Sequence, residues 1–430
     1  MSDYAGSYKL KKVSIIKNKS KSDISDLVRE INIWSYVNQP STTVMITIKD
    51  AVNFLNDLPI KGGQEIEIEV GFDNEIRIWK VVVVSVEDIN GATNQIVYNL
   101  RCVSHLLFKS HFTTISQSFS GKVSDIAKSI FEQFKHKDEK IREWEESVNS
   151  SVYIIPGWSP AQTLLWLASK SKAKDTNTNF KFFQDSFLNF NFLSLESLNK
   201  KYLDKNIQSF HYGIFKTDNL NRKRSEVNEI IKYSFNNSSN ILESFENGFL
   251  TGKITKFNMT SKNLNEVNFN YFNEFKNFKE STSNKRALWN KEDLSSTYLN
   301  EKFGNGLELD QISRFRDDNL SEENEIYDQS SIIKSYFNQS NNMVTVDIKG
   351  NNVTDIGQII NLNFPKIKPM DTGNLKDLLV SGRYLVIGKR HQFNRNDNLI
   401  TLDCIRDSNN IDSNYSGNKI DNSELGGEDV

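Results

Sequence analysis

The chain of 430 residues has little of several features that usually identify a class of protein. It contains 2 cysteines, its formal net charge is −2, and no apolar run approaches the roughly 18 residues of a membrane-spanning helix. Its first residues, MSDYAGSYKLKK, lack the apolar segment of a secretory signal peptide. We therefore expect no disulfide framework, no membrane insertion and no basic nucleic-acid-binding surface, in a protein made in a reducing compartment.

Familiar catalytic and ligand-binding motifs are missing as well. The sequence has no phosphate-binding loop, dinucleotide-binding fingerprint, GxSxG elbow or HExxH helix. Among the 5 histidines, His105 and His111 lie near each other without a third ligand in view, so we expect no metal site there. His391 falls in the polar part of a hairpin, which indicates a surface or interface residue. We predict no catalytic, cofactor-binding or metal-binding residues and no cofactor.

What the chain does contain is internal similarity. Three segments near the N-terminus recur in the same order near the C-terminus, at an offset of about 300 residues. The pairs are VMITIKD with MVTVDIKG, GQEIEIEV with GQIINLNF, and VYNLRCVS with LITLDCIRD, starting at Val44 and Met343, Gly63 and Gly357, and Val97 and Leu399. This pattern predicts one β unit that occurs twice, with a long insertion in or before the second copy.

The strands of the unit can be read from the alternation of side chains. Glu65–Val70 alternates acidic and apolar residues, which predicts a strand with one buried and one wet face. Trp79–Val86 is mostly apolar, which predicts a strand covered on both sides. Asn90-Gly91 then indicates a hairpin turn before Gln95–Val103. Such a meander must close or pack to protect its edges, so the sequence predicts two β-barrel-like domains.

The second copy repeats the hairpin, with Tyr384–Gly388 and Leu399–Ile405 on either side of a polar turn. Cys102 and Cys404 occupy matching places in the two copies, on strands expected to be buried. We predict two free thiols that pack as small apolar side chains.

Between the two copies the period of the sequence changes from strand to helix. Apolar residues recur at helical spacing from Val123 to Phe134. Ser159, Pro160 and Gln162 form the start of a second helix, with serine as the N-cap. Phe180–Phe183 and Phe187–Phe192 then predict an aromatic hairpin that turns at Asp185-Ser186. This section is expected to be an α+β domain.

The remaining segments are less regular. Glu226–Phe235 and Gly252–Met259 are expected to be the opening strands of the second barrel, and Ile332–Phe337 a short helix. The predicted fold class is α+β and mainly β, with two duplicated antiparallel β-barrels, a helix–hairpin domain between them and an insertion in the second barrel. The expected parts are the first barrel, the middle domain, the discontinuous second barrel, an inserted polar domain or loops, and a disordered tail: 1–108, 109–205, 206–260 with 326–407, 261–325, and 408–430.

Two groups of side chains have alternative interpretations. Glu65, Glu67 and Glu69 are expected to form the wet face of a strand, or else an acidic lining or interface. The hairpin phenylalanines are expected to pack in a core, although exposed rings could bind sugar.

The order of the predicted parts, a barrel, a helix–hairpin domain and an interrupted second barrel, resembles a known family, the baseplate hub proteins of contractile-tailed phages of the T-even type. The resemblance rests on the segments PGWSPAQTLLWLASKSKA, NFKFFQDSFLNFNF, GNNVTDIGQIINLNFP and YLVIGKRHQF. The last two are also similar to the hub portions of type VI secretion spikes, in which a glycine-led strand ending in proline precedes a G-x-Tyr-x-Val strand followed by histidine. The matching residues here are Gly357, Pro365, Gly382, Tyr384, Val386 and His391.

This resemblance implies a non-enzymatic structural protein of the virion tail baseplate, made in the host cytoplasm, with tail-tube-like barrels. Three copies with two barrels each would form a pseudo-sixfold ring. Such a homotrimer would join a hexameric tail tube, or tube-initiator protein, to the trimeric central spike or tail lysozyme. It would contact baseplate wedge proteins, and DNA would meet it only in transit through the lumen.

Other functions remain open at the level of sequence. A carbohydrate- or host-surface-binding tail protein would use the hairpin aromatics. A cell-wall hydrolase would need two positioned carboxylates or a metal site, and no such constellation stands out.

Overall fold

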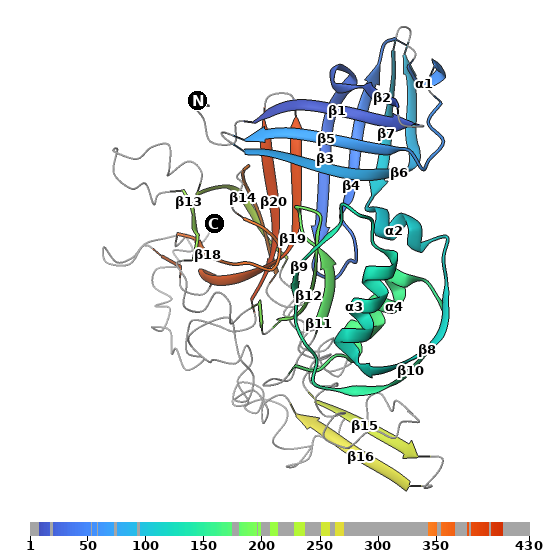
Figure 1. The fold of residues 1–430 in the computed structure, drawn as a ribbon. Coiled ribbons are helices and arrows are strands. Elements are labelled where there is room, and N and C mark those ends of the chain that lie inside the picture. The colour runs from blue at the N-terminus through green and yellow to red at the C-terminus, as the bar shows by residue number, and fades with distance from the viewer. Residues whose placement is uncertain are drawn as a thin grey trace, which may run out of the picture.

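The strands and helices of the protein are placed by a computed structural model (Figure 1). It describes residues 8–17, 20–52, 54–57, 59–72, 75–92, 95–173, 180–195, 197–198, 207–213, 228–236, 251–258, 263–270, 343–350, 354–365, 376–377, 380–394 and 397–406. The predicted short helix at Ile332–Phe337, most of the inserted segment and the tail lie outside these residues.

Strands dominate the described part of the chain. A first group consists of β1 (Lys9–Lys17), β2 (Ser20–Asp23), β3 (Val28–Tyr36), β4 (Thr43–Asp50), β5 (Glu65–Phe72), β6 (Glu75–Ala92) and β7 (Gln95–Val103), with the short helices η1 (Ser25–Leu27) and α1 (Phe54–Asp57). We call it the first β-unit. A later group, the second β-unit, consists of β13 (Ser209–Tyr212), β14 (Glu229–Asn236), β17 (Met343–Lys349), β18 (Ile359–Asn363), β19 (Gly382–Asn394) and β20 (Asn398–Ile405).

The chain between the two β-units forms a smaller α+β part. Its elements are α2 (His105–Ser110), β8 (Ile115–Lys122), α3 (Val123–Phe134), β9 (Lys140–Trp144), β10 (Ser150–Trp158), α4 (Pro160–Lys170), β11 (Phe180–Gln184) and β12 (Asn189–Ser194). The predicted helix start is confirmed, because the Ser159 side chain accepts a hydrogen bond from the Gln162 N–H. The aromatic hairpin is confirmed as β11 and β12, which pair Phe182 with Phe192.

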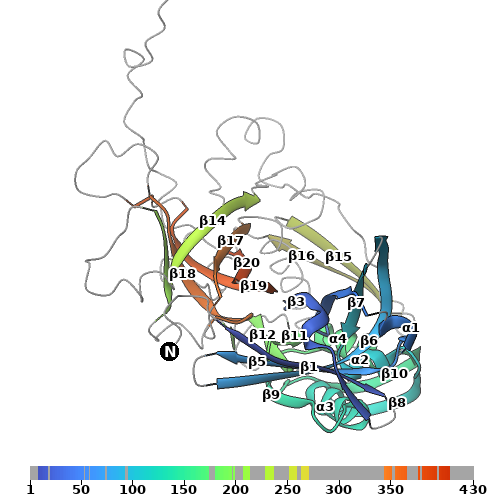
Figure 2. The same ribbon diagram turned by 90° about the horizontal axis from the view of Figure 1, so that it is seen from above.

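Both β-units belong to one 13-stranded sheet, in the order β18-β13-β14-β17-β20-β19-β3-β4-β7-β6-β5-β1-β2. An additional pairing of β18 with β19 closes the second β-unit into a barrel of 6 strands. Figure 2 shows the sheet from above as an arc that passes from β14 through β19 and β3 to β7. A mainly β fold with few helices was expected from the sequence, and it is confirmed.

The long strand β19 connects the two β-units. Its first half pairs with β18, from Leu385 opposite Ile359 to Gly382 opposite Leu362. Its second half pairs with β3 along the same edge, from Gly388 opposite Tyr36 onward. Phe393, near the end of β19, is 2% exposed and lies in the core of the first β-unit, with its ring centroid 5.9 Å from that of Trp79.

The central strands of the two β-units pair in corresponding registers. In the first unit β4 and β7 align Val44 with Cys102, Ile46 with Leu100 and Ile48 with Tyr98. In the second unit β17 and β20 align Val344 with Cys404, Val346 with Leu402 and Ile348 with Ile400. These are the residues that the sequence segments match. Both cysteines are buried and free, as predicted.

The irregularities of the two β-units correspond too. The register between β6 and β7 shifts between Val83 and Ser85, and that between β19 and β20 shifts between Val386 and Gly388. In each unit, a glycine with positive φ donates its N–H to the carbonyl of the strand residue just before the shift. Gly63 (φ 81°) donates to the Val83 carbonyl and Gly357 (φ 77°) to the Val386 carbonyl, each at 2.8 Å.

Three expectations about strands were wrong. Asn90-Gly91 is not a turn, because β6 continues to Ala92, which pairs with Gln95. The run Trp79–Val86 is not covered on both sides, since Val84 is 43% exposed. The segment at Gly252–Met259 forms β15 (Thr251–Asn258), but β15 pairs with β16 (Asn263–Asn270) in a separate two-stranded sheet and not in the second barrel.

Among the described helices, none combines the length and apolar character needed to cross a membrane.

The position of Phe393 generates a test of how the two β-units depend on each other. We expect Phe393→Ala to lower the free energy of unfolding by about 3–5 kcal/mol, because it empties a buried site in the first core. Phe112→Ala, at a residue that is 74% exposed, serves as the control and should change it by less than about 0.5 kcal/mol. Urea unfolding measures the free energy of unfolding of both variants. Equal effects of the two changes would contradict the burial of Phe393 in the core of the first β-unit.

Candidate functional site

The tip of the β11–β12 hairpin lies where the two β-units meet. It forms a tight turn because Asp185 Oδ1 accepts the N–H groups of Phe187 and Asn189, both at 2.9 Å. The Trp79 indole of β6 donates to the Ser186 carbonyl at 2.8 Å, and Lys389 Nζ of β19 lies 3.2 Å from Ser186 Oγ. The tip is thereby tied to strands of both β-units.

Four charged side chains lie in or beside this tip, and a fifth, Arg77, lies with its guanidinium 4.1 Å from the centroid of the Phe187 ring. Asp185 and Lys389 are 1% exposed and Asp355, which precedes β18, is fully buried. Arg142 Nη1 of β9 lies 3.1 Å from Asp185 Oδ2 and 3.4 Å from Asp355 Oδ2, while Lys389 Nζ donates to the Thr354 carbonyl at 2.7 Å. Buried charges persist only when they are paired and hydrogen-bonded, so the four groups must occupy their places together.

The pKa values reflect this burial. Burial and, to a lesser extent, the nearby Asp355 carboxylate raise the pKa of Asp185 to about 6, although Arg142 opposes the rise. Burial lowers the pKa of Lys389 to about 8, with Asp355 opposing the change. Both groups therefore still carry their charge at neutral pH, but Asp185 is close to accepting a proton.

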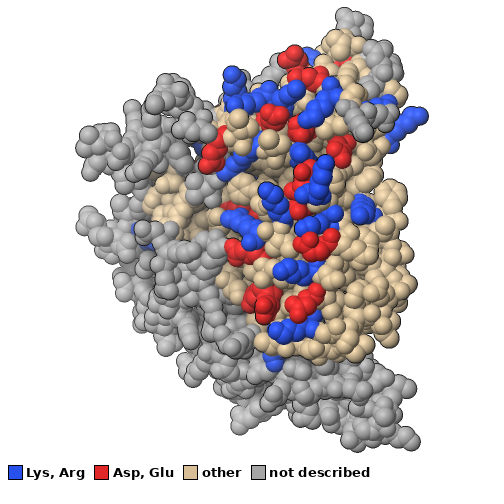
Figure 3. All heavy atoms as spheres, in the orientation of Figure 1, with Lys and Arg blue, Asp and Glu red and all other residues tan. Residues whose placement is uncertain are grey.

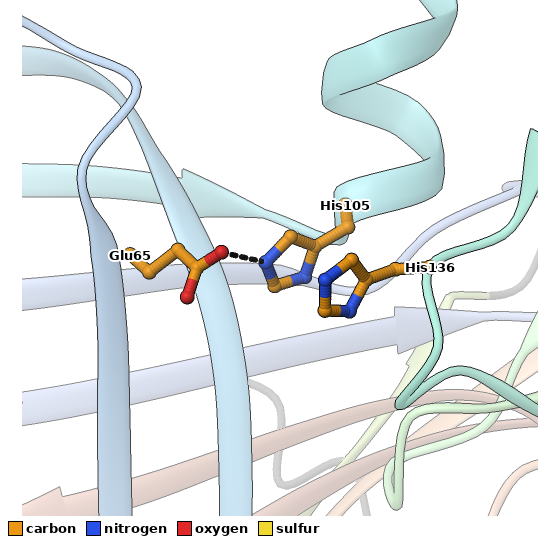
Figure 4. A group of neighbouring side chains, drawn as sticks. All are labelled: Glu65, His105 and His136. Atoms are coloured by element: carbon orange, nitrogen blue, oxygen red, sulfur yellow. Dashed lines mark hydrogen bonds and ion pairs between the residues drawn. The ribbon is translucent and has the colours of Figure 1, made fainter. Parts of the chain in front are cut away.

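A second cluster joins three elements of the chain (Figure 4). Glu65 at the start of β5, His105 at the start of α2 and His136 after α3 place potential metal-ligand atoms within 4.8 Å of one another. His105 Nε2 and Glu65 Oε1 are 3.1 Å apart, and the two imidazoles stack with centroids 4.2 Å apart at 12°. Burial lowers the pKa of His105, although the contact with Glu65 opposes this.

Stacked imidazoles do not direct their lone pairs at one point, because each lone pair lies in the plane of its own ring. A metal ion could bind both histidines only if one ring turned. The arrangement therefore ties the first β-unit to the α+β part without forming a metal centre as it stands. His111, the histidine closest to His105 in sequence, is exposed and not part of this cluster.

The acidic row of β5 is partly neutralised by neighbouring bases. Lys21 Nζ lies 2.8 Å and Lys80 Nζ 3.9 Å from the Glu67 carboxylate, and Lys12 faces Glu69 across β1 and β5. On the face seen in Figure 3, basic and acidic side chains are interspersed. The wet-face interpretation therefore fits the row better than an acidic wall.

Two further expectations are decided by burial. His391 is 2% exposed, so the expectation of a surface residue was wrong; its ring packs against Phe393, with centroids 4.0 Å apart. Burial lowers the pKa of His391 well below the usual value, and Lys389 adds to the effect. Five of the hairpin phenylalanines are buried, which confirms core packing and removes them as sugar-binding rings: Phe180, Phe182, Phe183, Phe190 and Phe192.

The buried charges were missed because their residues are far apart in sequence. Asp185 and Asp355 stand among 55 acidic residues, and nothing in their spacing marks them. The one available signal was Asp185-Ser186 at the predicted hairpin turn, which placed the tip but not its partners.

Comparison with known proteins gives no match in sequence, either to a protein-family model or to a curated protein. Comparison of folds, in contrast, gives matches to solved structures. A tail protein from Neisseria meningitidis aligns over 93% of this chain and 96% of its own, with a TM-score of 0.56 and 12% identity. The chain has the fold of a phage tail protein.

Other solved structures extend the comparison. The 43 kDa tail protein of prophage MuSo2 from Shewanella oneidensis aligns over 93% of this chain and 98% of its own, with a TM-score of 0.55 and 12% identity. A component of the type VI secretion system of Escherichia coli aligns over 93% of this chain and 76% of its own, with a TM-score of 0.47 and 9% identity. The structural similarity to phage tail proteins thus covers most of the chain.

The charge cluster generates a test with a pH-dependent readout. We expect Lys389→Met to lower the free energy of unfolding by about 3 kcal/mol at pH 7.5, because two buried carboxylates lose a neighbouring cation. The loss should shrink at pH 5, where Asp185, whose pKa is already raised to about 6, takes up a proton and needs no counter-charge.

Lys128→Met, on the exposed face of α3, is the matched control and should leave stability nearly unchanged at both pH values. Urea unfolding at the two pH values measures the difference. A loss that is the same at pH 5 and pH 7.5 would show that Lys389 acts through packing and not through charge.

Proposed function

We propose that the chain is a structural, non-enzymatic hub of a contractile-tail baseplate. Three copies form a ring of six β-units that joins a hexameric tail tube, or tube-initiator protein, to a trimeric spike. The ring contacts wedge proteins at its periphery and becomes part of the channel through which DNA passes. The similarity in fold to the tail proteins from Neisseria meningitidis and Shewanella oneidensis supports a place in a tail.

One observation supports the proposed ring more directly than the similarity in fold does. The two β-units share strand register, bulge position and glycine contact, although they are far apart in sequence. Such agreement is what a duplicated unit would leave behind, and two equivalent units in each copy allow threefold symmetry to approximate sixfold symmetry. A ring of this kind can meet a sixfold tube on one face and a threefold spike on the other.

The domain assignment follows the same logic. We assign 1–108 to the first tube-like barrel, 109–205 to the middle domain, and 206–250 with 326–407 to the second barrel. The separate sheet of β15 and β16 indicates that the inserted domain begins near 251, ahead of the expected 261.

The two alternative functions have less support. The carbohydrate-binding alternative relied on the hairpin phenylalanines, which are buried. A hydrolase needs carboxylates that substrate can reach, whereas the close pair Asp185 and Asp355 is buried and bound to Arg142.

Light scattering of the purified protein, alone and with candidate trimeric spike proteins, tests the proposal. We expect a trimer, or a monomer that becomes a complex of three hub and three spike chains. An interface of this kind should bury on the order of 2,000 Å² per contact, so the trimer should persist at micromolar concentration. A protein that stays monomeric with every tail component would contradict the hub function.

A further inference from the structure

A cluster of side chains that can bind metal lies where the first β-unit meets the α+β part (Figure 4). Glu65 comes from β5, His105 from α2 and His136 from the loop after α3. Two imidazoles and one carboxylate are a ligand set that zinc accepts, with water in the remaining position. The cluster therefore contains the chemistry of a zinc site, and its geometry decides whether an ion can bind.

Two of the three residues already have the spacing of zinc ligands. Zinc bonds of about 2.0–2.2 Å in a tetrahedron place neighbouring ligand atoms roughly 3.3–3.5 Å apart. His105 Nε2 and Glu65 Oε1 are 3.1 Å apart, and potential ligand atoms of all three residues lie within 4.8 Å of one another. One ion can therefore bridge Glu65 and His105 after small movements, and only His136 must move further.

The third ligand belongs to a side chain that has room to turn. The His136 side chain is 29% exposed, and its Nδ1 accepts the Asp138 N–H at 3.4 Å, which is a long and weak hydrogen bond. A turn of the ring gives up that hydrogen bond and the stack on His105. In exchange, a ring nitrogen gains a bond to the metal ion.

The backbone segments that carry the two histidines are fixed relative to each other. The buried Glu139 carboxylate accepts the Leu106 N–H at 2.9 Å and the His136 N–H at 2.8 Å. One side chain thus connects the first turn of α2, next to His105, to the residue that carries the second imidazole. Because this backbone is already held, binding an ion needs little further ordering beyond the His136 side chain, which lowers the entropic cost of binding.

The surrounding charge favours a cation. The Asp138 carboxylate lies 3.7 Å from His136 Nδ1, and Glu65 supplies a second carboxylate. The neighbouring Lys80 has its ammonium 3.1 Å from Asp138 and 3.9 Å from Glu67, so two carboxylates balance its charge. An ion can also reach the cluster from solvent, since the Glu65 side chain is 41% exposed.

We propose that Glu65, His105 and His136 bind a zinc ion when the His136 ring turns, and that the ion fastens β5 of the first β-unit to the α+β part. Binding exchanges the stacked arrangement of the imidazoles for two bonds between nitrogen and zinc. The site does not depend on the ring of the proposed function, because all three ligands come from one chain.

Titrations with cobalt(II) and zinc test the site on the full-length chain, purified without an affinity tag. We expect uptake of one ion per chain, a visible absorption band typical of cobalt(II) with four or five ligands, and displacement of cobalt by zinc. His136→Asn, which removes the ligand that has to turn, should weaken zinc binding by at least about tenfold. Glu65→Gln, which removes the charged ligand, should have a similar effect. His111→Asn, at an exposed histidine outside the cluster, is the matched control and should leave the affinity unchanged.

Stability gives a second readout of the same site. Saturating zinc should raise the urea midpoint of the unaltered chain, because the ion binds the folded state, and it should not raise the midpoint of His136→Asn. The His136 side chain is partly exposed, so this variant is expected to fold, which circular dichroism checks.

Uptake of no ion would overturn the proposal. Zinc binding that His136→Asn and Glu65→Gln leave unchanged would also overturn it, since it would show an adventitious ion only. A chain that stays monomeric with every tail component, yet binds one zinc ion through His136, would contradict the proposed ring and leave this inference intact.

Discussion

The fold depends on the hydrogen bonding of β19, a single strand shared between two β-units. A strand has two edges, and β19 gives one edge to β20 along nearly its whole length. It divides the other edge between β18 and β3. A shift of one residue at the join would turn every side chain of this part of β19 to the other face. Phe393 and His391 would leave their buried positions, so the register is fixed by the cores on both sides.

The α+β part is held in place by polar interactions at the same junction. Burial of Asp185, Asp355 and Lys389 opposes folding, and the shifted pKa values of Asp185 and Lys389 reflect this cost. Mutual pairing offsets the cost only when the hairpin tip is in place. Apolar packing alone would accept several orientations of the hairpin. The need to satisfy each buried charge and hydrogen bond selects one of them.

Much of this fold could be predicted from periodicity and repetition. The alternation in Glu65–Val70, the apolar spacing from Val123 to Phe134 and the cap at Ser159 are local signals, and local physics decided those elements. Asn90-Gly91 failed as a turn because the pairing of β6 with β7 overrode a local preference. The position of His391 was predicted wrongly because its hairpin is polar in sequence, while its ring packs against Phe72 of the distant strand β5. The charge cluster and the histidine stack could not be predicted, since their members come from separate elements that only the fold brings together.

The shared strand also bears on how the chain folds as it is synthesised. Arg390 and Asn32, which are hydrogen-bonded across the join, are 358 residues apart in sequence. A domain that folds as it leaves the ribosome usually finds all of its core residues in the chain already made. Here the first β-unit lacks Phe393 and the partner of β3 until translation has reached the end of β19. Completion of its core is therefore coupled to the last strands, and a truncated chain would retain an open edge on β3.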